Sequence, residues 1–268
     1  SKYLGEVFDI HGGGMDLQFP HHECEIAQST VVHHKMPARY WVHNNMITIN
    51  GRKMGKSYNN VIKLSELFSG NHPLLSQPYH PMTIRFFILQ SQYRGTLDFS
   101  NEALQAAEKA LKRLLEAQEW LASQKQLTGG NQPKDAELDA KVQKLLGELP
   151  GFMDDDLNTA KVLANLFELV PVINSLKDGH IDPEALKTDT LQMLTTQVTL
   201  FVKDIFGLQT GHPGENARFD GVMQLLMDIR KDARSKKDFM TSDRIRDRLA
   251  ALGIQLKDEK GGGMRYSV

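Results

Sequence analysis

The chain has 268 residues, of which 40% are hydrophobic and 24% are charged, and this composition is typical of a folded globular protein with one or two domains. No apolar run approaches the roughly 20 residues that a membrane-spanning helix needs, and no secretory signal is visible, which excludes a membrane-spanning protein. The single cysteine, Cys24, excludes an intramolecular disulfide framework and predicts a reducing, cytoplasmic location.

Charge is distributed unevenly along the chain. Its overall formal value of −1 divides into +2 for residues 1–100, −6 for residues 101–210 and +3 for residues 211–268. An acidic middle between two basic ends predicts separate modules, with any polyanionic partner binding at the ends.

The first part of the chain is predicted to be α/β. Short apolar runs and turn signals predict strands, and longer segments predict helices. The expected elements are a strand at 8–10 ending at a glycine turn, a helix at 21–32, strands at 41–43 and 46–49, a connector at 71–81 and a helix at 82–89.

A helical region follows. Ser100 is placed to cap a helix whose apolar residues lie on one face as far as Leu121. Similar patterns at 138–149 and 162–173, and a further helix from 183 to 206, predict an antiparallel bundle of about four helices. After a loop at 209–214, helices at 219–233 and 241–252 and a hairpin near the end predict a small α/β module.

Two lysines three residues apart lie in the string Lys53-Met54-Gly55-Lys56-Ser57, after a predicted strand and the Asn50-Gly51 turn. Both ammonium groups can approach a polyphosphate there, and Gly55 permits close approach of the backbone. The alternative is a solvated basic turn, which composition alone favours.

A second candidate site lies in the histidine-rich segment, since six of the ten histidines fall between His11 and His43. On a helix, His21 and Glu25 share a face at a spacing suited to two metal ligands, although zinc needs further ligands. The alternative is a helix start whose acidic residues interact with the helix dipole. The glycine turn at 12–14 with Asp16 could bind a nucleotide or a substrate amine, but tight glycine turns are mostly structural.

Together these motifs are far more specific than each one alone. The segment HGGGMDLQFPHHECEIAQS at residues 11–29, followed by KMGKS at 53–57, resembles cysteinyl-tRNA synthetase. The resemblance continues through TIRFF at 83–87, DDDLNT at 154–159 and the segment 247–254, and so covers essentially the whole chain.

The resemblance implies that successive segments of the chain correspond to different domains of the enzyme. Residues 1–58 correspond to the second half of a class I Rossmann catalytic domain with its KMSKS-type loop, residues 59–100 to a connector, residues 101–210 to a helical bundle and residues 211–268 to an anticodon-binding module. The HIGH-type signature and two cysteine zinc ligands of the family are missing. We therefore expect this chain alone not to activate cysteine.

Individual site residues also follow from the resemblance. It assigns His21 and Glu25 as ligands of one zinc ion, Lys53 and Lys56 as catalytic lysines, and a set that binds ATP or substrate: His11, Gly13, Asp16, Lys56 and Ser57. Arg234, Asp243 and Asp258 occupy anticodon-reading positions. Gly55 replaces the family's serine, and Cys24 replaces an asparagine.

The implied function is ligation of cysteine to tRNA(Cys) by a cytoplasmic monomer that uses ATP with magnesium. A thiolate is a good zinc ligand and a hydroxyl is not, so zinc would separate cysteine from serine. Two alternatives stay open: an ATP-dependent ligase that joins cysteine to an amino sugar, and an RNA-binding module without catalysis. The basic C-terminal module favours an RNA partner.

Overall fold

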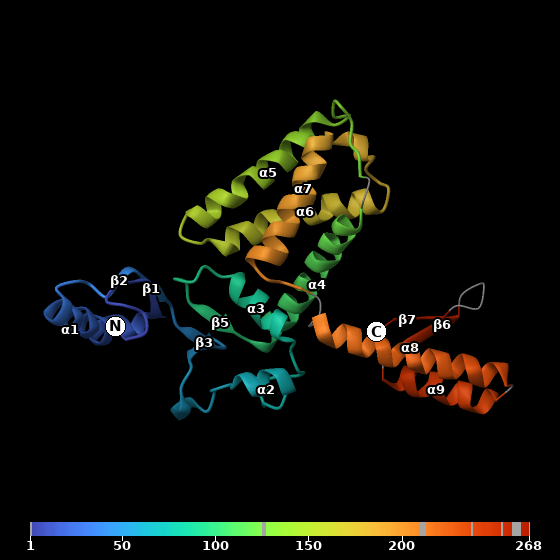
Figure 1. Ribbon diagram of the computed structural model, residues 1–268, viewed down its shortest axis with the longest axis horizontal. Helices are drawn as coiled ribbons and strands as arrows, with labels where there is room; N and C mark the ends of the chain where they lie inside the picture. The colour runs from blue at the N-terminus through green and yellow to red at the C-terminus, as the bar shows by residue number, and fades with distance from the viewer. Residues whose placement is uncertain are drawn as a thin grey trace. The chain divides into compact units, whose positions relative to one another are not determined.

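The computed structural model describes residues 2–124, 127–209, 213–236, 238–252, 254–258 and 264–267; among these, the side chains of 213–220, 255, 257, 258, 264, 265 and 267 are not described. The chain divides into two compact units, Ser1–Gln209 and Thr210–Val268, which Figure 1 colours from blue to amber and from orange to red. The predicted fold class, α/β followed by a helical bundle and a small α/β module, is confirmed.

The first unit begins with a parallel strand–helix–strand arrangement. Strand β1 (Phe8–Gly14) pairs in parallel with β2 (Ala38–Asn44), and α1 (Glu23–His33) connects them. The predicted end of the first strand at Ile10 is wrong, because the glycines continue the ladder as far as the pair Gly14–Asn44. The helix α1 begins at Glu23, two residues after the predicted start at His21, and it is preceded by a short irregular helical segment at Gln18–His22 in which Phe19 is extended.

A small three-stranded sheet follows, in the order β4-β3-β5. Strands β3 (Ile47–Ile49) and β4 (Arg52–Lys53) form a hairpin through the predicted Asn50-Gly51 turn, and β5 (Leu97–Phe99) pairs with β3 in parallel. Helices α2 (Leu64–Ser69) and α3 (Pro81–Leu89) complete this layer. The helix predicted at 82–89 corresponds to α3, which begins one residue earlier.

Four helices form the bundle that packs on this layer. They are α4 (Asn101–Ser123), α5 (Ala136–Asp154), α6 (Thr159–Lys177) and α7 (Thr188–Thr199), which Figure 1 shows side by side. Ser100 caps α4 as predicted, its hydroxyl oxygen accepting the amide hydrogen of Ala103 at 3.1 Å. The fourth helix begins at Thr188 and not at 183, because Asp182 caps a separate short turn at 183–185.

The second unit pairs two helices with a hairpin. Helices α8 (Pro213–Ser235) and α9 (Phe239–Ala251) pack through a small core of Met223, Leu249 and Ile254. Strands β6 (Gln255–Asp258) and β7 (Met264–Ser267) are antiparallel. Helix α8 begins six residues before the predicted start, because Pro213, expected in a loop, opens the helix, where proline is tolerated. Among the described helices, none is long and apolar enough to cross a membrane.

Candidate functional site

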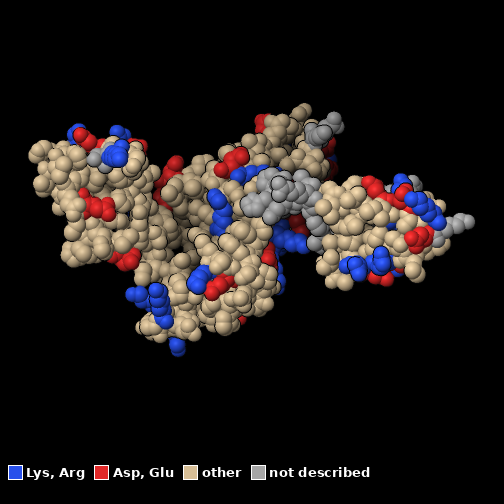
Figure 2. Space-filling model, turned by 60° about the horizontal axis from the view of Figure 1, so that its bottom comes forward, with Lys and Arg blue, Asp and Glu red and all other residues tan. Residues whose placement is uncertain are grey.

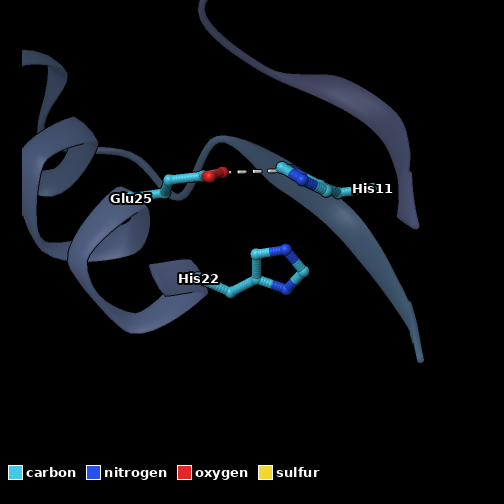
Figure 3. Close-up of side chains that lie close together, drawn as sticks. All are labelled: His11, His22 and Glu25. Carbon is cyan, nitrogen blue, oxygen red and sulfur yellow. Dashed lines mark ion pairs between the residues drawn. The ribbon is translucent and has the colours of Figure 1, made fainter. Parts of the chain in front are cut away.

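Three potential metal-ligand side chains converge between β1 and α1. The ligand atoms of His11, His22 and Glu25 all lie within 4.8 Å of one another, and Figure 3 shows the three groups facing one another. His11 Nδ1 lies 3.4 Å from Glu25 Oε2. The cluster thus draws on the strand, on the turn before the helix, and on the first turn of the helix.

Packing fixes the two rings of this cluster. The His11 ring stacks on Trp41 with a centroid distance of 4.4 Å, and His22, only 4% exposed, places Nδ1 at 2.8 Å from His43 Nε2. A Cβ atom at Gly13 would lie 2.6 Å from the His22 ring. Gly13 therefore serves the site by letting His22 approach the strand, because any larger residue would displace the ring.

This cluster suits a zinc ion. Two imidazoles and one carboxylate are zinc donors, and such a set leaves a fourth position open for a small ligand. The His11 Nδ1 atom is buried and makes no hydrogen bond with the described residues, so it offers a lone pair or a proton towards Glu25. The donor chemistry and the orphaned nitrogen therefore fit the zinc that the resemblance implies.

The structure does not reproduce the expected ligand pair in full. Glu25 belongs to the cluster, whereas His21 is exposed and lies outside it. His22 takes part instead: it precedes Glu25 by three residues, a spacing that also places two side chains on one face of a helix. Cys24 is exposed, and Asp16 is exposed in the turn after β1, also outside the cluster.

The lysine-bearing loop lies at the end of the β3–β4 hairpin. Lys53 ends β4, Lys56 and Ser57 enter a short helical turn, and all three residues are exposed. Asn60 is buried, with 8% of its surface exposed, and its side chain makes two hydrogen bonds to the backbone of the loop. Its Oδ1 accepts the Gly55 amide hydrogen at 2.9 Å, and its Nδ2 donates to the Lys53 carbonyl at 3.1 Å. Sequence reasoning missed Asn60, because an asparagine in a polar string carries no distinctive signal.

An apolar contact anchors the same loop. Met54 packs against the main core and lines a cavity of about 150 Å³. The cavity walls are apolar and include Ile49, Leu67, Phe87 and Leu97. The loop is therefore fixed at Met54 and at its backbone, while its two ammonium groups extend into solvent.

The expected anticodon residues lie in the second unit. Arg234 is in the last turn of α8, and Asp243 lies on α9 with Oδ1 at 3.3 Å from Nη1 of Arg246. Asp258 ends β6, but its side chain lies outside the described residues. Figure 2 shows basic and acidic side chains intermixed on the visible face of this unit.

Comparison with known families accounts for most of the chain. The model for the class I (C) tRNA synthetase catalytic domain matches residues 1–109. The DALR domain model matches residues 151–209, and the model of the cysteinyl-tRNA ligase anticodon binding domain matches residues 219–263.

Curated relatives are similar over nearly the whole chain. Cysteine–tRNA ligases of Porphyromonas gingivalis and Bacteroides thetaiotaomicron are each 49% identical over 264 residues, which is 97% of this chain and 52% of the relative. The cysteine–tRNA ligase of Chlorobium chlorochromatii is 41% identical over 266 residues, or 98% of this chain and 52% of the relative. The chain thus spans about half the length of the curated relatives it matches.

A solved structure shares the fold. The ternary complex of Agrobacterium radiobacter LeuRS with tRNA and LeuAMS matches with a TM-score of 0.52 and 18% identity. The match covers 74% of this chain and 26% of that one. At this identity the likeness shows the fold alone, and the fold is that of a class I synthetase.

Proposed function

The chain belongs to the cysteinyl-tRNA synthetase family, of which it represents the C-terminal portion, and on this premise we propose that it serves ATP-dependent ligation of cysteine to tRNA(Cys). One observation carries the proposal: catalytic, DALR and anticodon-binding models match a single chain in that order, and relatives are 49% identical over 97% of it. The anticodon-binding match at 219–263 favours tRNA over an amino sugar as the acceptor.

The proposed roles divide as the resemblance implies. Residues 1–58 contribute to cysteine activation, residues 59–100 form the connector and stem-contact region, the bundle 101–210 acts mainly as a spacer, and residues 211–268 bind the anticodon. A cytoplasmic location and a monomeric state belong to the same proposal.

The lysine loop is proposed to stabilise the phosphates of ATP–magnesium. Attack of the cysteine carboxylate on the α-phosphate needs positioning and charge stabilisation more than covalent help from the protein. Lys53 and Lys56 supply mobile ammonium groups, while Asn60 and Met54 hold the backbone between them. His11, Gly13, Asp16 and Ser57 are proposed to contact ATP or cysteine.

A zinc ion is proposed to select the amino acid. When bound, zinc supplies an acceptor for a thiolate that the hydroxyl of serine cannot match. Glu25 is a proposed ligand on both lines of argument. The resemblance adds His21 as its partner, whereas the geometry adds His11 and His22.

Exposed apolar surface on the β1–β2 sheet indicates that further structure completes the catalytic layer. Ile10 and Tyr40 lie on a parallel sheet that has two strands among the described residues, and they are 64% and 68% exposed. Phe19, in the segment before α1, is 78% exposed. Parallel sheets are normally covered on both faces. We therefore propose that the active enzyme needs a segment equivalent to the remaining half of the longer relatives.

Complementation tests this function. The 268-residue chain alone is expected to show no cysteine-dependent exchange between ATP and pyrophosphate. Adding the purified N-terminal half of the Porphyromonas gingivalis relative should restore exchange, and Lys56→Ala should abolish the gain. Lys177→Ala, in the bundle, is the matched control and should leave it intact. Exchange by the isolated chain, or with an amino acid other than cysteine, would contradict the proposal.

A further inference from the structure

Asp156 collects an unusual set of hydrogen bonds at the corner between α5 and α6. One carboxylate oxygen accepts from the hydroxyl of Tyr93 at 2.6 Å, and the other lies 2.7 Å from Nε of Arg94. Nε2 of Gln92 donates to the same carboxylate at 3.2 Å. Three consecutive side chains of the loop after α3 thus converge on a single acid.

The backbone of this corner is held in an unfavourable form. Asp156 and Leu157 have φ values of 59° and 53°, in the left-handed region that residues other than glycine rarely adopt. The hydroxyl of Thr159 donates to the carbonyl of Leu89 at 2.7 Å, which ties the corner to the end of α3 as well. Such a conformation persists where surrounding contacts fix it, and here those contacts come from the loop 90–95.

The opposite side of the same loop holds Asn45. The amide nitrogen of Asn45 donates to the Tyr93 carbonyl at 2.9 Å, and its side-chain Nδ2 donates to the Arg94 carbonyl at 2.9 Å. Asn45 directly follows β2, whose His43 lies against His22, and precedes β3, whose hairpin leads to the lysine loop. It therefore lies between the two parts of the candidate site.

We propose that Asp156 is a positioning residue: through the loop 92–94 it fixes Asn45, and so sets the placement of the histidine cluster relative to the lysine loop. The two parts of the site come from different sheets, and they must reach one ligand together. The catalytic consequence rests on the proposed function, whereas the mechanical coupling does not.

Amide hydrogen exchange on the 268-residue chain tests the coupling directly. Asp156→Ala should speed exchange at residues 45–53 by about two- to fivefold, the range expected for loss of exposed charge-assisted contacts. Amides of 162–176 in α6 should keep their protection. Asp155→Ala is the matched control, because that neighbour contacts only Lys161 among the pairs described, at 3.5 Å, and should leave 45–53 unchanged.

A conservative variant separates positioning from general damage. Asp156→Asn tolerates left-handed backbone and keeps one acceptor oxygen for the Tyr93 hydroxyl, but it replaces the oxygen that faces Arg94 and Gln92 by an NH2 donor. It should therefore restore only part of the protection at 45–53 that Asp156→Ala loses. Faster amide exchange confined to 90–97 and 155–159 would overturn the proposal, as would an increase spread through α4–α7.

In the complemented enzyme, Asp156→Ala should raise the KM for ATP more than it lowers tRNA binding. If no complemented variant, wild type included, catalyses exchange between ATP and pyrophosphate, the proposed function is refuted, but the coupling seen by amide hydrogen exchange still stands.

Discussion

At the scale of single residues, the lysine loop depends on one buried amide. Asn60→Ala removes the acceptor for the Gly55 amide and the donor to the Lys53 carbonyl. Leaving a fully buried backbone group unpaired costs about 1–3 kcal/mol, and the partly buried groups of this loop should cost less. We expect faster exchange of the Gly55 amide and a lower midpoint of urea unfolding. Asn59→Gly is the control, because Asn59 has a φ of 50°, which glycine adopts readily. It should neither speed exchange of the Gly55 amide nor lower the midpoint of urea unfolding. Equal behaviour of the two variants would contradict this role.

The histidine cluster makes a second prediction, which decides between two ligand sets. If the observed grouping binds the metal, His11→Ala and His22→Ala should each weaken Zn²⁺ binding to the chain by at least about tenfold, because even outer partners of metal ligands change affinity about 10–100-fold. His21→Ala and the exposed control His34→Ala should have little effect. Isothermal titration with Zn²⁺ measures this. Loss of binding in His21→Ala alone would favour the ligand pair implied by resemblance.

Asp98 gives the hairpin a defined response to pH. The hydroxyl of Thr48 and the amide of Gly51 both donate to its carboxylate, at 2.6 and 2.7 Å, and they lower the pKa of Asp98. Because the pKa is lower in the folded state, this contribution is present at neutral pH and is lost as the pH falls through the folded-state pKa. Asp98→Asn should therefore be less stable than wild type at pH 7, with the difference shrinking in acid. Chemical denaturation at several pH values measures it, and a difference that stays constant with pH would contradict the assignment.

At the scale of elements, helical periodicity carried more information than local turn signals. The apolar faces of α4, α5 and α6 could be predicted because burial of a helix stripe repeats at a fixed spacing. The break before α1 was missed although it has a local cause: Phe19 precedes Pro20, and a residue before proline favours extended backbone. The place of His22 in the cluster was missed because it depends on the approach of α1 to β1, which is a tertiary contact. Asn60 and Asp156 act through tertiary hydrogen bonds, which no spacing in the sequence reveals.

The bundle core makes an element-scale prediction. Leu166 on α6 is 1% exposed, so Leu166→Ala should cost about 2–5 kcal/mol of unfolding free energy through lost burial and a cavity. Leu157, 53% exposed just before the same helix, is the matched leucine control and should cost far less. Urea denaturation followed by circular dichroism compares the two variants. A similar loss in both would mean that α6 is not part of the cooperative core.

At the scale of the whole molecule, the proposed functions of the two units, cysteine activation and tRNA recognition, are expected to be separable by mutation. The second unit has its own core, and its helices carry the proposed anticodon residues Arg234 and Asp243. Phosphate contacts supply affinity and salt dependence, whereas contacts to unstacked base edges supply sequence choice. Changes at base-reading positions should therefore affect the second half-reaction and leave the first intact.

In the complemented enzyme, Arg234→Ala and Asp243→Ala should weaken charging of tRNA(Cys) while sparing cysteine-dependent pyrophosphate exchange. Lys236→Ala is the comparison variant, and the Nζ of Lys236 lies 3.3 Å from Oδ2 of Asp232 on the exposed surface. If Lys236 contacts a tRNA phosphate, as we propose, its loss should weaken binding of all tRNAs and reduce the salt slope by about one. Paired charging and exchange assays at several salt concentrations separate these outcomes. Equal loss of both half-reactions would indicate a folding defect, since the proposed catalytic residues lie in the other unit. Unchanged charging in both variants would refute the anticodon assignment.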